Sequence, residues 1–124
     1  MPEVEIKKGN AYDIEFLVKD KDGNPVQDLG NTQEIIFVLK RNKEDSDEEA
    51  LILKKKTLGQ ITVDDPDTGY VKVSLLADDT DIAPGLYFAG LQLDYGNGKV
   101  YEVDIYVDSQ QIETFKVKQD IVRG

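Results

Sequence analysis

The side chains best suited to chemistry are carboxylates gathered in three turns. In the first turn Asp20, Asp22 and Asn24 alternate as the opening ligands of a calcium loop do, where oxygen atoms converge on a hard cation. The glutamate that would close such a loop is missing at the required spacing, because the first glutamate downstream is Glu34. We therefore predict a plain hairpin turn here.

The other two carboxylate clusters have similar structural explanations. Asp64-Asp65-Pro66-Asp67 could hold a cation, but turn chemistry accounts for its composition. Asp78, Asp79 and Asp81 could serve general acid–base catalysis only if burial separated their pKa values. The segment from Leu76 to Ala83 is instead predicted to be a helical turn, ended by Pro84-Gly85, whose first-turn carboxylates complement the helix N-terminus. The sequence thus predicts no metal site and no catalytic residue.

Composition excludes several classes of function. The chain has no histidine and no cysteine, which rules out a Ser-His-Asp triad, a thiolate metal site and a disulfide framework. Its 15 basic and 25 acidic residues give a net charge of −10, which repels nucleic-acid phosphates and anionic membrane surfaces. We expect a protein that is not an enzyme, has no cofactor-binding residues, and contacts neither nucleic acid nor membrane. Met1 to Ile6 has no basic start and no apolar run, so we expect no signal peptide.

Three tyrosines raise the possibility of a ligand site. Tyr87, Tyr95 and Tyr101 could form a platform on which sugar rings stack, as in carbohydrate-binding modules. Their alternation with polar residues places them instead with the aliphatic residues of a core-facing strand surface, and no tryptophan is present. We predict that they belong to the core or its edge.

Alternation with period two dominates the chain and predicts strands. Short turns rich in Gly, Asn, Asp and Pro separate these segments, and Gly96-Asn97-Gly98 predicts the clearest hairpin. The pattern indicates one all-β domain over residues 1–124, an immunoglobulin-like β-sandwich of seven to nine strands with one short helical turn. The predicted strands lie at 12–19, 32–40, 51–57, 61–63, 70–75, 87–95, 101–107 and 112–117.

The same pattern predicts which residues are buried. The run from Ile35 to Leu39 is apolar on both faces, which is typical of a central strand covered on both sides. The charged segment from Arg41 to Ala50 should be an exposed, mobile loop. The inward-facing core is expected to include Phe16, Phe37, Val73, Leu91 and Val103.

Two alternatives stay open for the C-terminal segment. Ile112, Phe115 and Val117 form a short apolar strand, and Ile121-Val122 follow near the terminus. This strand could fold onto the edge of its own sheet, or it could serve a partner. Deletion of residues 119–124 would weaken association only in the second case.

The order of these features resembles the immunoglobulin-like N-terminal domain of phage baseplate upper proteins and related small tail or virion proteins. The resemblance covers about residues 4–107. Its most characteristic part is Leu76-Ala77-Asp78-Asp79-Thr80 followed by Pro84-Gly85-Leu86-Tyr87. Other matching segments are Ile6-Lys7-Lys8-Gly9, Tyr12-Asp13-Ile14-Glu15-Phe16, Val18 to Val26, Asp28-Leu29-Gly30, Ile35-Ile36-Phe37-Val38, Ile61-Thr62-Val63 and Gly69-Tyr70-Val71.

The resemblance implies a non-catalytic structural module of a phage or prophage particle, located in the virion. Its partners would be other phage structural proteins, with homo-oligomers possible. In that family the chain continues into a coiled or receptor-binding part, which we expect to be lacking here because the sequence ends at Gly124. The alternative from a different class is a carbohydrate-binding β-sandwich module of a bacterial surface protein.

Overall fold

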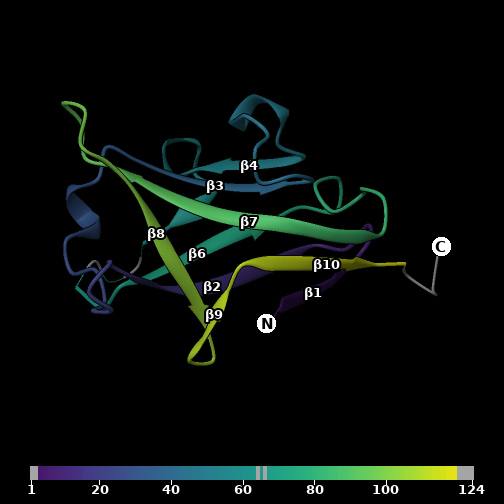
Figure 1. Cartoon of the computed structure of the whole chain (residues 1–124), viewed down its shortest axis with the longest axis horizontal. Coiled ribbons are helices and arrows are strands. Elements are labelled where there is room, and N and C mark those ends of the chain that lie inside the picture. The colour runs from purple at the N-terminus through teal and green to yellow at the C-terminus, as the bar shows by residue number, and fades with distance from the viewer. Residues whose placement is uncertain (1–2, 64, 66, 120–124) are drawn as a thin grey trace.

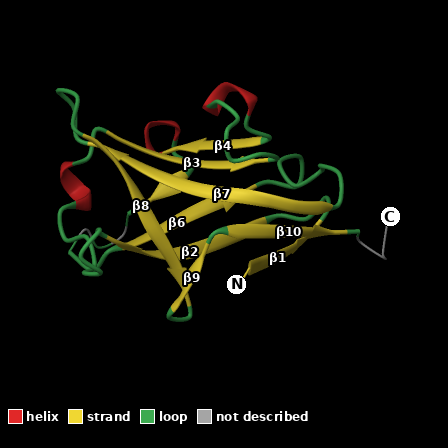
Figure 2. Ribbon diagram, viewed as in Figure 1, coloured by secondary structure: helices red, strands yellow, loops and turns green. Residues whose placement is uncertain are grey.

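Ten strands make up the described part of the chain, which comprises residues 3–63, 65 and 67–119 of a computed structural model. Three short 3₁₀ turns lie between strands: η1 (Leu29–Asn31), η2 (Asp47–Glu49) and η3 (Lys56–Leu58). Figures 1 and 2 show the arrangement. The strands are β1 (Glu3–Lys7), β2 (Tyr12–Lys19), β3 (Glu34–Lys40), β4 (Ile52–Lys55), β5 (Ile61–Thr62), β6 (Tyr70–Leu75), β7 (Gly85–Asp94), β8 (Val100–Val107), β9 (Gln110–Ile112) and β10 (Thr114–Lys118).

The strands form two packed sheets joined by β8. Sheet A has the order β4-β3-β7-β10-β1, and sheet B has the order β5-β6-β2-β8-β9. The pairs are antiparallel except for β1 and β10, which run parallel. The predicted all-β sandwich is therefore confirmed.

Strand β8 belongs to both sheets. Its first residues, Val100 to Val103, pair with β7 in sheet A, whereas Asp104 to Tyr106 pair with β2 in sheet B. The chain turns through β9 in sheet B and returns to sheet A at Glu113, whose carbonyl accepts a hydrogen bond from the Ala89 N–H. In Figure 1, β8 diverges from β7, and β10 then lies beside the other half of β7.

Three phenylalanines form the centre of the core. Phe16 of sheet B contacts Phe37 and Phe115 of sheet A, with ring centroids 5.7 Å and 6.1 Å away, and the latter two rings lie 5.7 Å apart. All three side chains are fully buried. Four of the five predicted core residues are buried, while Val103 is only partly buried because it lies where β8 leaves sheet A.

Several sequence-based predictions need correction. The strand count exceeds seven to nine because β1 was missed and the segment from Ile112 to Val117 belongs to two strands rather than one. β1 is short, and its partner β10 lies more than a hundred residues away in the sequence, so local patterning gives little signal for it. The segment from Leu76 to Ala83 is not helical; it forms consecutive turns, with the Leu76 carbonyl accepting from the N–H groups of Asp79 and Thr80.

The importance of Phe115 leads to a stability prediction. Phe115→Ala should lower the free energy of unfolding by about 3–5 kcal/mol, because it removes a ring that contacts both other phenylalanines and leaves a cavity. Urea denaturation measures the change, and Leu58→Ala, at a side chain 66% exposed, is the control. A loss as small as that of the control would contradict the central role of this ring.

Candidate functional site

The carboxylate of Asp20 stabilises a turn. Its Oδ1 accepts hydrogen bonds from the backbone N–H groups of Asp22 at 2.9 Å and Asn24 at 3.0 Å. Gly23 has a positive φ of 83°, which glycine adopts without strain. The segment is thus the predicted turn, and in it one carboxylate replaces a backbone acceptor.

The second aspartate cluster also forms a turn, as far as it is described. Asp65 Oδ1 accepts from the Asp67 N–H at 3.1 Å, while Asp64 and Pro66 lie outside the described residues. Within the described ranges, no group of three or more Asp or Glu residues is placed to bind a metal ion.

A side chain at Gly69 would meet Pro25 Cβ and the Val18 carbonyl at 3.1 Å, so this position requires glycine.

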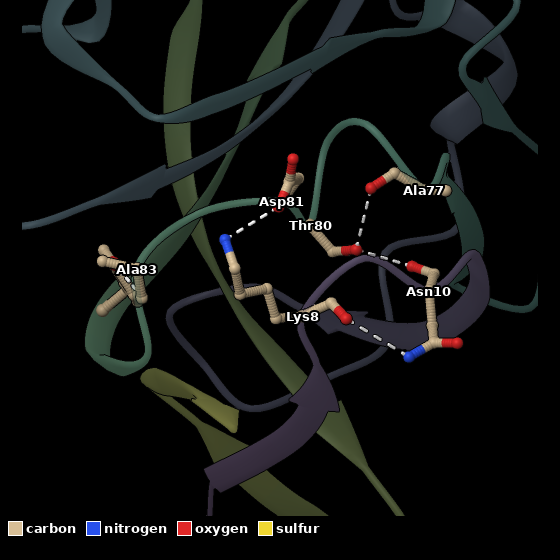
Figure 3. Close-up of polar contacts among 7 residues, drawn as sticks. Lys8, Asn10, Ala77, Thr80, Asp81 and Ala83 are labelled. Carbon is tan, nitrogen blue, oxygen red and sulfur yellow. Dashed lines mark hydrogen bonds and ion pairs between the residues drawn. The ribbon is translucent and has the colours of Figure 1, made fainter. Parts of the chain in front are cut away.

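The third cluster binds the 76–83 segment to the rest of the molecule (Figure 3). Asp81 pairs with Lys8 at 2.7 Å, and the buried Thr80 hydroxyl donates to the Asn10 carbonyl at 2.7 Å. Asp79 accepts from the Leu76 N–H and pairs at 2.5 Å with Lys54, whose side chain is only 6% exposed. The segment is a turn rather than a helix, but Asp79 does cap its first N–H group, as predicted. The pairing of Asp79 and Asp81 with lysines distant in the sequence was not predicted.

The three tyrosines occupy two different places. Tyr87 is buried, and its hydroxyl donates to the Ala83 carbonyl. Tyr95 and Tyr101 lie together at an edge-to-face angle, with centroids 5.9 Å apart. Tyr87 confirms the predicted core role and Tyr95 lies at the core edge, whereas Tyr101 is 53% exposed.

Tyr95 and Tyr101 line a groove of about 910 Å³ between the β7–β8 hairpin and the 20–28 segment. Burial, together with a 2.7 Å hydrogen bond to Asp28, raises the pKa of the Tyr95 hydroxyl. The hydroxyl donates this hydrogen bond to the Asp28 carboxylate and so holds the ring in place. The polar residues that also line this groove are Asp20, Lys21, Asp22, Asn24, Gln27, Asp28 and Glu102.

A second groove, of about 430 Å³, crosses the outer face of sheet A. Its floor is formed by Ile36 and Val38 of β3 and by Phe88, Gly90 and Gln92 of β7, which lie opposite one another in the antiparallel register. Gly90, opposite Val38, leaves the middle of the floor without a side chain. Ile36, Val38 and Phe88 are only partly buried.

This exposure corrects the prediction that β3 is covered on both sides. Ile35, Phe37 and Leu39 face the core and are fully buried, whereas the alternate residues Ile36 and Val38 face the groove. The outer face of sheet B is different, because it presents Asp13, Glu15 and Lys72. Leu17, Tyr70 and Tyr106 also lie on this outer face of sheet B, so the groove with an apolar floor, rather than apolar exposure as such, is what distinguishes sheet A.

The charged loop after β3 forms one side of this groove. Lys43 and Asp47 line it, and the Lys43 ammonium lies 5.2 Å from the centre of the Phe88 ring. Lys40 pairs with Asp47 at 2.8 Å, and Ser46 and Glu49 form a reciprocal capping box around η2. The loop is exposed, as predicted, but it contains local structure.

The C-terminal segment folds onto its own sheet. Ile112, Phe115 and Val117 are buried, and β10 pairs with both β1 and β7. Of the two alternatives, the intramolecular one is therefore confirmed, and these side chains are not a surface for a partner. Ile121 and Val122 lie outside the described residues.

Neither of two comparisons with known proteins found a match. A search of protein-family models found no match for this chain, and a search of curated proteins found none either. In the described residues there is no helix of the length and hydrophobicity needed to cross a membrane.

The buried ion pair gives a second stability prediction. Asp79→Asn leaves the Lys54 ammonium buried without its counter-charge, and we expect a loss of about 3–5 kcal/mol in the free energy of unfolding. Chemical denaturation measures it, with Asp78→Asn, at an exposed neighbouring position, as the matched control. Equal stability of the two variants would show that the pair does not hold the 76–83 turn.

Proposed function

We propose that this protein is a non-catalytic assembly module that works through protein–protein contacts. One observation supports this most: β3 is apolar on both faces, yet only one of them is covered by the protein's own core. Partly exposed apolar side chains that line a groove on an otherwise acidic protein are typical of an interaction surface. The outer face of sheet A is therefore the proposed contact surface.

The sheet edges add further support. Among the described strands, β4 pairs only with β3, and β1 pairs only with β10. Such edges offer unpaired backbone groups that another chain can extend. Both edges belong to sheet A, the sheet that carries the groove with the apolar floor.

The biological setting is the more specific part of the proposal. The segment 76–87, which resembles the corresponding part of phage baseplate upper proteins, is bound to the fold by Lys54, Lys8 and the Asn10 carbonyl. These contacts support a structural role for the segment. We propose a phage or prophage particle as the location and other structural proteins of that particle as the partners.

The contact proposal is tested with the purified products of the genes that flank this one. At least one product should bind the protein, and Val38→Glu should reduce the affinity by at least about tenfold, because it places a charge in an apolar contact. Lys72→Glu, on the outer face of sheet B, is the control. Calorimetric titration measures binding, and thermal melts verify that both variants are folded. If Lys72→Glu loses binding while Val38→Glu retains it, the contact surface lies on sheet B and not on sheet A.

A second candidate function, carbohydrate binding, is favoured by the groove around Tyr101. An exposed aromatic ring can stack on a sugar, while carboxylates and amides accept and donate hydrogen bonds to its hydroxyls. If this candidate is right, polysaccharides should change the tyrosine fluorescence in a saturable way in the wild-type protein but not in Tyr101→Ala. Tyr70→Ala, with a similarly exposed ring on sheet B, is the control. An absence of saturable change would contradict this candidate.

A further inference from the structure

The turn between β7 and β8 contains the only Asn-Gly pair of the sequence, Asn97-Gly98. In such a pair the backbone nitrogen of the glycine can attack the side-chain carbonyl of the asparagine, because glycine has no Cβ to hinder the approach. In a folded protein the reaction also requires that this nitrogen is free of a hydrogen bond and that the turn has room to rearrange. Both conditions are met at Asn97-Gly98.

The Gly98 N–H donates no hydrogen bond to any of the described residues. Its neighbours hold the turn together: the Tyr95 N–H donates to the Lys99 carbonyl at 2.9 Å, and the Lys99 N–H donates to the Gly96 carbonyl at 2.9 Å. Gly98 itself takes part through its carbonyl, which accepts from the Val100 N–H at 3.2 Å. The nitrogen that would react is therefore not engaged by the turn.

The tip of the hairpin has room for the rearrangement. Asn97 and Gly98 are exposed, and a Cβ placed on Gly98 would have no heavy atom within 4 Å. In Figure 1 the loop between β7 and β8 projects away from the sandwich. Asn97 has a φ of 54°, in the left-handed region that residues with a side chain rarely adopt. Packing therefore does not oppose its departure from this conformation when the ring closes.

The turn at Asp22-Gly23 has the opposite arrangement. Its glycine is also exposed and also has a positive φ, of 83°. However, the Gly23 N–H donates to the Asp20 carbonyl at 3.0 Å, and the Asp22 N–H donates to Asp20 Oδ1 at 2.9 Å. The nitrogen that would have to attack is thus occupied in this turn.

We propose that Asn97 is a site of spontaneous deamidation in the folded protein. The Gly98 nitrogen, after losing its proton to hydroxide, forms a bond to Asn97 Cγ. The bond from Cγ to Nδ2 breaks, and ammonia leaves with a proton taken from water. Water then opens the resulting succinimide ring at one of its two carbonyls, which gives aspartate or isoaspartate. The balance is one water consumed and one ammonia released.

The reaction changes the hairpin tip in two ways. Either product adds one negative charge near Tyr95, and isoaspartate also lengthens the backbone of the turn by one methylene group. The inference is independent of the proposed contact surface, because Asn97 lines neither of the two grooves.

Incubation of the full chain in mildly alkaline buffer tests the proposal. Peptide mass spectrometry should show an acid in place of the amide at position 97, and labelling with an isoaspartate methyltransferase should detect the isomer. The rate should rise in proportion to the hydroxide concentration. Asn97→Gln should keep its amide, because its ring closure would need six atoms instead of five.

Asp22→Asn is the matched variant, because it creates a second Asn-Gly pair whose glycine N–H is hydrogen-bonded. Position 97 should react at least about threefold faster than position 22, the factor expected when one backbone hydrogen bond must first break. Equal rates at the two positions would overturn the proposal, since the free N–H would then not select the site.

Urea below the unfolding transition distinguishes reaction in the native turn from reaction after global unfolding. It multiplies the unfolded population but leaves the native turn intact, so the rate at Asn97 should stay the same. A rate that rises with the unfolded population overturns the proposal. So does an Asn97 amide that is lost only in the fully denatured chain.

Discussion

The contact between Phe16, Phe37 and Phe115 connects the elements on which the rest of the structure depends. The three rings come from β2, β3 and β10, and each contacts the other two across the space between the sheets. Close packing of large side chains leaves little room for alternative arrangements. It therefore sets which face of each strand is inward, and through the period of two it also sets which residues face outward. The exposure of Ile36 and Val38 is a consequence of burying Phe37.

Strand β8 contributes residues to both grooves. Glu102 still pairs with β7 opposite Gln92, and Asp104 follows directly after β8 leaves β7, so both residues line the groove on the outer face of sheet A. Tyr101, the residue before Glu102, contacts Tyr95 and lines the groove beside the 20–28 segment. Two surfaces of different chemistry, one apolar and one polar with an exposed ring, thus lie on opposite faces of the same part of β8, because neighbouring residues of a strand point to opposite faces.

The ion pair between Lys54 and Asp79 neutralises a buried charge. Lys54 follows the alternation of β4 into a buried position, where an ammonium group without a partner is costly. Asp79 reaches it from the turn before β7 and also caps that turn at the Leu76 N–H. The same carboxylate therefore neutralises a buried charge and shapes the approach to β7, the strand that carries much of the groove floor.

The sequence by itself determined the class of fold, most strand positions and the main core residues, because alternation and turn formers act over a few neighbouring residues. It indicated Phe16 and Phe37 as core and Gly96-Asn97-Gly98 as a hairpin turn, whose three residues do have positive φ. Only the tertiary structure decided the features that depend on distant partners. The pairing of β1 with β10, the binding of Asp79 to Lys54 and the exposure of Ile36 and Val38 are of this kind. Each depends on which segment packs against which, and the spacing of residues along the chain does not encode that choice.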